Sequence, residues 1–513
     1  MLVAGACASA PPARRDVVVG LLGEPQSVFS SEPGARFLAG AVTESLVRRD
    51  ARDEFVPRLA EAVPTLENGG LRVVVDDPLT PGGRLEATFR LRANARWQDG
   101  QAITASDVRF AWESDRNAPA GTDARFVADR VVNILVLDDR TAMLVYAANE
   151  RWLDYPLAPH VLPRHWLAGL LPAQRAAYDR EPMHAGPFAV AAWLPGLGVT
   201  LSAFKDYVGG PPRLGRIEVR FLPSRAAILD ALRRGDVDVA ASSALEADLT
   251  RTLDQFADGA KLATYYVQTE AMNVLRFGAN ATRFGDPRVR AAVALAIDRQ
   301  SIVDDVFAGR ARVPQGYLVA PLWAASSGAA PRHPDRETGR ALLAAAGFLR
   351  GPFGIVERGG DRMIVTITVA DGSAARVDVA RRAAGDLAAV GIAAEVRERP
   401  LGEVQAGVAR GDVDLAVVPE SASDPQSASA RYLGMAGPWF DVLAAAAARA
   451  PDRADKAILY AELQRVWLEA LPALPLYQEL TVDVAPRALT GVRPTPAGAP
   501  LSWNVAEWAY AGR

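Results

Sequence analysis

The sequence is poor in the residues that build covalent cross-links and metal centres. Of its 513 residues, one is cysteine (Cys7) and four are histidine. A single cysteine excludes an internal disulfide and any cysteine-based zinc or iron–sulfur centre. Pro163 separates His160 from His165, which argues against a pair of metal ligands on one helical face. We therefore expect neither a metal site nor a cofactor.

Long apolar runs and blocks of like charge are also missing. After the first few residues no run reaches about 18 consecutive apolar residues, so no membrane-spanning helix is expected. The formal net charge is −3 and basic residues alternate with acidic ones, which excludes a basic face of the kind that binds nucleic acid. Since domains usually hold about 150 residues, the length predicts about three compact units.

What is present is an alternation of predicted strands and helices. Residues 17–21 are an apolar run typical of a buried strand, and an apolar-striped helix is expected around residues 38–46. Apolar and polar residues alternate over 85–92, which predicts a strand with one buried face, paired in a hairpin with 71–75. The pattern indicates an α/β fold.

Two distant segments carry the same helix-to-strand corner. Ser224 can cap a helix that runs to Arg234, and Gly235 supplies the left-handed residue that ends it. The string RGDVDV that starts at Arg234 recurs as RGDVDL from Arg410. Because this glycine already has a backbone role, we do not expect the Arg-Gly-Asp triplet to serve adhesion. The repeat predicts two lobes that share one corner.

Cys7 follows a short run of small and apolar residues and precedes residues 8–12, which are typical of a flexible tether. This arrangement resembles a bacterial lipobox, in which the cysteine is lipidated and becomes the mature N-terminus. The resemblance implies a periplasmic or extracytoplasmic protein that a lipid anchor holds at the cell membrane. A chance cysteine is the alternative, because the charged region and full apolar stretch of a signal peptide do not precede it.

Short motifs follow one another along nearly the whole chain. In order they are WQDG from Trp97, TASDV from Thr104, HVLPRH from His160, GPF from Gly186, DYVGG from Asp206, FGDPRVR from Phe284, AIDR from Ala296 and LPALPLY from Leu471. Each is weak alone, but the ordered series resembles extracellular solute-binding protein family 5. These proteins are the dipeptide, oligopeptide and nickel receptors of ABC importers.

The resemblance implies an α/β fold like that of type II periplasmic binding proteins of the cluster C kind, with two lobes, hinge strands and an inserted subdomain. Mapped onto this chain, the lipobox remnant and tether take 1–15, lobe I takes 16–50, 180–272 and 475–513, the inserted subdomain of lobe I takes 51–179, and lobe II takes 273–474. The implied protein is a monomeric receptor that closes on a peptide or peptide-like ligand. It would deliver this ligand to the permease subunits.

The resemblance also points to a ligand-binding loop in lobe II. Peptide-binding members hold the ligand's α-ammonium with an acidic residue just before an Asp-Pro pair. Here the pair is Asp424-Pro425, and the expected position reads Ser421. Either a neighbouring carboxylate takes over or the ligand has no free amine, since a hydroxyl cannot neutralise an ammonium. A plain polar surface loop at 421–429 is the alternative. The candidate ligand-binding residues are Gln26, Ser27, Glu420, Ser421, Asp424, Trp439 and Phe440.

Catalytic motifs are absent. The sequence has no Gly-x-Ser-x-Gly elbow, phosphate-binding loop, dinucleotide glycine fingerprint or His-Glu-x-x-His helix. We assign no catalytic residue and expect a protein that is not an enzyme. An enzyme or sensor on the same fold is one alternative, because a fold does not fix function. A receptor for an opine-like conjugate, a sugar or a metal chelate is another.

Overall fold

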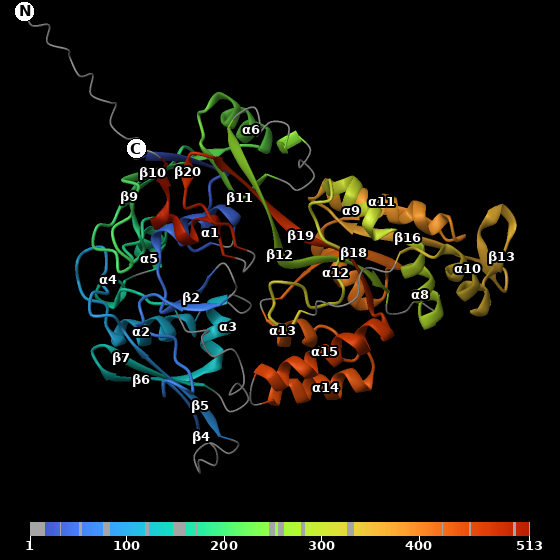
Figure 1. The fold of residues 1–513 in the computed structure, drawn as a ribbon, viewed down its shortest axis with the longest axis horizontal. Coiled ribbons are helices and arrows are strands. Elements are labelled where there is room, and N and C mark those ends of the chain that lie inside the picture. Colours follow the sequence, from blue (N-terminus) through green and yellow to red (C-terminus); the bar gives the residue numbers. More distant parts are fainter. Residues whose placement is uncertain are drawn as a thin grey trace, which may run out of the picture.

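The chain forms two bodies that two long strands connect (Figure 1). This computed structural model describes residues 16–30, 32–50, 54–74, 83–117, 123–146, 160–170, 172–245, 252–254, 261–278, 283–325, 333–422, 424–450, 453–495 and 499–511. Cys7 lies outside the described residues, so its lipidation stays a prediction.

A mixed sheet of ten strands runs through both bodies in the order β17-β16-β18-β12-β19-β11-β1-β10-β9-β8. The strands β12 and β19 pair with each other; β12 also pairs with β18 in the second body, and β19 with β11 in the first. We call β12 and β19 the linking strands. The bounds are β1 Asp16–Leu22, β8 Phe188–Leu194, β9 Gly198–Ala203, β10 Arg216–Leu222, β11 Val239–Leu245, β12 Leu262–Phe277, β16 Ile364–Ala370, β17 Ala393–Arg399, β18 Leu415–Ser421 and β19 Ala473–Pro486.

Helices cover both faces of the sheet in the first body. One core joins the odd-numbered residues of β1 to α1 (Pro33–Val42) and the 3-10 helix η4 (Leu501–Glu507), and the other joins Val18 to α6 (Arg225–Arg234). The helix predicted around residues 38–46 was placed too late. Pro33 suits the first turn of α1, and the backbone of Thr43 is already extended, so the helix ends at Val42.

A separate four-stranded sheet has the order β4-β5-β7-β6. The predicted hairpin is confirmed, with Leu71 opposite Ala87. Thr104 and Asp107 form a capping box that starts α2. The elements here are β2 Val47–Arg49, β3 Phe55–Pro57, β4 Leu71–Val74, β5 Arg84–Arg90, α2 Ala105–Asp115, α3 Asp123–Arg130, β6 Val131–Asp138, β7 Thr141–Tyr146, α4 Arg164–Leu167 and α5 Pro172–Arg180.

In the second body α8 to α11 pack on one face of the sheet, and α12 to α15 pack on the other. Aspartates cap two of these helices: Asp286 accepts from Arg288 N at the start of α8, and Asp298 accepts from Ser301 N at the start of α9. Helix bounds are α8 Pro287–Ala296, α9 Arg299–Phe307, α10 Arg336–Ala345, α11 Ala374–Ala388, α12 Leu401–Arg410, α13 Pro425–Ala430, α14 Pro438–Arg449 and α15 Arg453–Ala470.

Short elements complete the fold. They are β13 Leu349–Arg350, η3 Pro352–Gly354, β14 Val356–Arg358, β15 Asp361–Arg362, β20 Leu489–Thr490 and β21 Ala509–Tyr510. Within the described ranges, no helix is both long enough and apolar enough to cross a membrane.

Candidate functional site

The parallel strands of the two bodies point their carboxyl ends toward each other. In the first body β1 runs parallel to β10 and β11, and in the second β16 runs parallel to β17 and β18. Because β11 is antiparallel to β19 and β18 is antiparallel to β12, each set ends at the side that faces the other body. Ligands of open α/β sheets bind outside the carboxyl ends of such strands. The candidate site is therefore the region between these two sets of ends.

The loop after β1 supplies the first side of this region. Gln26 is exposed and Ser27 is half-buried. The carboxylate of Glu24 fixes the loop on the β8–β9 hairpin: it accepts from Trp193 Nε1 at 2.7 Å and from Gly196 N at 2.7 Å. The hydrogen bond from Trp193 is the largest cause that lowers the pKa of Glu24 below its usual value. A fixed loop with an exposed Gln26 is suited to contact a ligand.

Glu420, the last residue but one of β18, lies on the opposite side, but its side chain points into the second body. It is 6% exposed. One carboxylate oxygen accepts from Arg276 Nε at 2.5 Å, and the other accepts from Tyr432 Oη at 2.6 Å and lies 3.4 Å from Arg431 Nη1. Burial, followed by the charge of Glu420, raises the pKa of Tyr432. A buried carboxylate needs such partners, so the geometry favours a structural role for Glu420.

Asp424 is also engaged within its own segment. It accepts from Ser427 N at 2.8 Å and from Ser427 Oγ at 2.5 Å, and it thereby caps α13, whose first residue is Pro425. Ser421 is exposed, and its carbonyl oxygen accepts from Arg431 Nη2 at 2.6 Å. The charged group bound to Ser421 is therefore a guanidinium rather than a carboxylate.

Trp439 and Phe440 open α14 and point to different sides. The side chain of Trp439 is 56% exposed, whereas Phe440 is fully buried with its ring 5.8 Å from that of Tyr317. Neighbouring helical residues differ by about 100° in direction, so the two cannot share one environment. Trp439 is exposed and its ligand contact stays a prediction, whereas Phe440 is a core residue whose predicted ligand contact gains no support.

A polar cluster at the crossing of the linking strands was missed by the sequence analysis. Arg376, near the start of α11, donates from Nε to Asn273 Oδ1 at 2.8 Å. Asn273 Nδ2 donates to Glu479 Oε1 at 2.7 Å, and Arg376 Nη2 lies 3.6 Å from the same oxygen. The available signal was an Asn and a Glu inside otherwise apolar strands. The side chain of Glu479 is 33% exposed, so this cluster is partly open to solvent.

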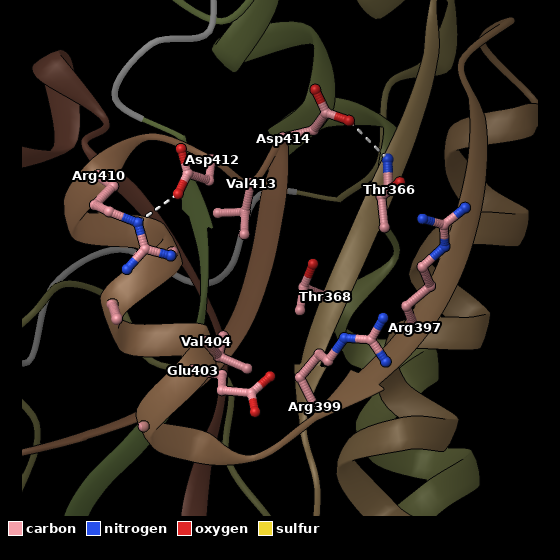
Figure 2. A pocket seen from close by; sticks show the side chains of 13 residues that line it. Thr366, Thr368, Arg397, Arg399, Glu403, Val404, Arg410, Asp412, Val413 and Asp414 are labelled. Carbon is pink, nitrogen blue, oxygen red and sulfur yellow. Dashed lines mark hydrogen bonds and ion pairs between the residues drawn. The ribbon is translucent and has the colours of Figure 1, made fainter.

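A pocket of about 600 Å³ lies elsewhere, between β16, β17 and α12 (Figure 2). Its charges are balanced, with three arginines and three acidic residues, and several are engaged: Arg410 pairs with Asp412, and Asp414 accepts from Thr366 N at 2.9 Å. The pocket borders β17, the edge strand of the sheet. It is thus separate from the region between the bodies, and we assign it no ligand.

His165 and His184 have structural contacts. His184 is 1% exposed, its Nδ1 accepts from Ala185 N at 2.9 Å, and its ring meets Trp97 edge-on. Burial lowers the pKa of His184 to about 3. His165 Nε2 lies 2.8 Å from Asp99 Oδ2. Among the residues that the structure describes, no three His, Cys, Asp or Glu side chains gather into a metal-binding group.

Comparison with known protein families decides the identity of the chain. The model of the bacterial extracellular solute-binding proteins, family 5, matches residues 54–438. The chain belongs to this family. The resemblance drawn from the ordered motifs is confirmed, and residues 54–438 include both the Trp97 motif and the Asp424-Pro425 pair.

Curated relatives of this chain are distant in sequence. Protein XP55 of Streptomyces lividans is 26% identical over 392 residues, which cover 75% of this chain and 67% of that protein. Di/tripeptide-binding protein 2 of Pseudomonas aeruginosa is 24% identical over 485 residues, which cover 87% and 86%. Matches to putative ABC transporter peptide-binding proteins of Brucella span 44% of those proteins' length.

Solved family 5 structures share the fold over the full chain. The oligopeptide-binding protein AppA of Bacillus subtilis, in complex with a nonapeptide, has a TM-score of 0.71 and 19% identity, and the match covers 98% of this chain and 100% of AppA. NikZ of Campylobacter jejuni, in complex with Ni(L-His), has a TM-score of 0.74 and 19% identity, with 97% and 99% covered. The predicted periplasmic-binding-protein-like fold is confirmed. The lobe boundaries stay a prediction.

Proposed function

We propose that the protein is the substrate-binding receptor of a bacterial ABC importer, and that it captures a small, peptide-like solute by closing its two bodies about β12 and β19. The observation that carries the proposal is the meeting of two sets of strand carboxyl ends across the linking strands. On this proposal the bodies are lobes I and II with the predicted boundaries. The loaded receptor then delivers its solute to the permease as a monomer anchored through Cys7.

The relatives support a peptide or peptide-like solute. Several carry names of peptide-binding proteins, and a similar structure holds a nonapeptide. In this chain the exposed Trp439 supplies an apolar surface on which a side chain or main chain of the solute can pack.

The hydrogen bonds of Glu420 and Asp424 within the second body narrow the class of solute further. A free α-ammonium enclosed between the lobes needs a carboxylate partner, because leaving it unpaired costs several kcal/mol. Glu420 and Asp424 are both hydrogen-bonded within lobe II, and Ser421 is bound to Arg431. A solute without a free amine at this position therefore fits better than an ordinary dipeptide. An opine-like conjugate or a metal chelate is the second candidate for the same reason.

The test is a titration of the purified protein with dialanine and N-acetyl-dialanine, followed by tryptophan fluorescence and native mass spectrometry. We expect the acetylated peptide to bind at least about tenfold more tightly, since its nitrogen carries no charge. Both peptides should be recovered unchanged. Steady formation of a product would contradict the receptor function. Equally tight binding of dialanine would contradict the preference for a solute without a free amine.

A further inference from the structure

An ion pair joins the two bodies beside the linking strands. Arg310 Nη2 lies 2.9 Å from Asp254 Oδ2. Tyr266, in β12, contacts both partners: its hydroxyl donates to Asp254 Oδ1 at 2.8 Å, and its ring centroid is 4.9 Å from the guanidinium carbon of Arg310. The side-chain amide of Gln268, also in β12, donates to Arg310 O at 2.5 Å. Asp254 and Arg310 therefore form a compact cluster that bridges the bodies.

Each end of this bridge is anchored in its own body. Leu253, the neighbour of Asp254, is fully buried in the core beneath α6. Arg310 follows α9, whose last residue Phe307 is buried in the core of the second body. Gly309, at φ +72°, turns the chain out of the helix. A rotation of one body against the other therefore changes the separation of Asp254 and Arg310.

The bridge lies on the side of the linking strands that carries α6 and α9. Figure 1 shows these helices on one side of β12 and β19, with β2, α13 and α15 on the other side. Tyr266 packs against the α6 core, and Arg310 leaves α9. A hinge rotation that brings β2 toward α13 draws α6 away from α9. Closing of the lobes therefore stretches the pair.

We propose that Asp254 and Arg310 are positioning residues that hold the lobes apart and lower solute affinity from outside the binding site. The proposal rests on the solute-binding function proposed above. An interaction present only in the separated form reduces the fraction of molecules ready to close, and apparent affinity falls by the same factor. The side chains of Arg310 and Asp254 are 47% and 37% exposed, so the expected effect is about two- to fivefold.

The experiment measures the lobe separation without any solute. Spin labels are placed on cysteines at Leu66 in the inserted subdomain and Val442 in α14, both more than half exposed, in a Cys7→Ser background. In Asp254→Asn and in Arg310→Gln, the ratio of short to long label distances is expected to rise about two- to fivefold. The charge-swapped Asp254→Arg, Arg310→Asp double variant should return toward the original distribution.

The matched control is Arg382→Gln. It breaks the equally exposed Arg382–Asp305 pair, which lies wholly within the second body, and it should leave the distances unchanged. Unchanged distances in both Asp254→Asn and Arg310→Gln, or a shift to longer ones, overturn the proposal. Because no solute is present, this result stands even if the peptide titrations fail. With N-acetyl-dialanine as the probe, the dissociation constant should fall about two- to fivefold in both variants.

Discussion

The two RGDVD corners have the same geometry in different surroundings. Gly235 and Gly411 end their helices at φ +74° and +76°. The second aspartate of each corner accepts a backbone N–H from the neighbouring parallel strand at 2.9 Å: Asp238 from Val18 and Asp414 from Thr366. Local sequence thus dictates the same helix stop and the same strand tie in both bodies.

The difference between the corners lies in what surrounds them. Asp238 is 9% exposed, and α6 buries Ile228, Ala231 and Leu232 in its core. Asp414 is half-buried and borders the pocket of Figure 2, which α12 lines with small and charged residues, among them Gly407, Glu403 and Arg410. The comparison teaches that one sequence motif fixes backbone geometry, while its surroundings fix how much each contact contributes to stability.

The contrast between buried and exposed contacts should have its largest effect on stability at two carboxylates near the strand ends, Glu420 and Glu24. Glu420→Gln in the second body leaves Arg276, whose side chain is 7% exposed, without a counter-charge. We expect a loss of about 3–5 kcal/mol in the free energy of unfolding, because a buried pair loses one partner. Urea unfolding followed by circular dichroism measures it.

The matched control in the first body is Glu24→Gln. Its side chain is exposed, and a glutamine oxygen can still accept from Trp193 Nε1 or Gly196 N. A loss of at most about 1 kcal/mol is expected. Equal losses in Glu24→Gln and Glu420→Gln would contradict the burial that the structure assigns to Glu420.

Loss of the aspartate-to-backbone hydrogen bond should destabilise the two corners unequally, by a smaller difference than that between Glu420→Gln and Glu24→Gln. Asp238→Ala leaves the N–H of Val18 unpaired in the first body, and we expect a loss of about 2–3 kcal/mol in stability. Asp414→Ala exposes the N–H of Thr366 to water, and about 1 kcal/mol is expected. Thermal unfolding of both variants gives the comparison. A larger loss for Asp414→Ala would show that the half-buried tie is the stronger one.

The glycines that end the two helices should contribute equally to stability in both corners. Gly235→Ala and Gly411→Ala each force a side chain into the left-handed region, which costs about 1–2 kcal/mol. A Cβ at Gly235 meets no atom within 4 Å, so there the cost is conformational alone. Both variants should lose stability equally in thermal unfolding. Asn at either position should restore part of the loss, and a failure of Asn to do so would contradict the conformational explanation.

The sequence predicted what depends on neighbours within a few positions. The corners and the 71–92 hairpin both follow from local spacing. The start of α1 was misjudged because the apolar stripe was weighed above Pro33, which fixes the first turn. Local patterns therefore predicted which helices and strands form more accurately than they predicted where these elements begin and end.

The candidate site depends on partners that are far apart in the chain. Glu420 meets Arg276 across 144 positions, and Arg376 meets Asn273 across 103. No local pattern shows whether a carboxylate at a strand end turns inward to such a partner or outward to a ligand. The order of the family's motifs located the loop, but only the packed structure shows that Glu420 and Asp424 are already engaged.

The course of the linking strands has a consequence for synthesis and export. The second body between β12 and β19 comes from one continuous stretch, whereas the first body needs β1 and α1 from one end and β19 and η4 from the other. Contacts of long sequence separation form slowly, and domains made from continuous stretches fold as units. The lobe synthesised first is thus completed last. Until β19 is synthesised, the edge of β11 that pairs with it stays open.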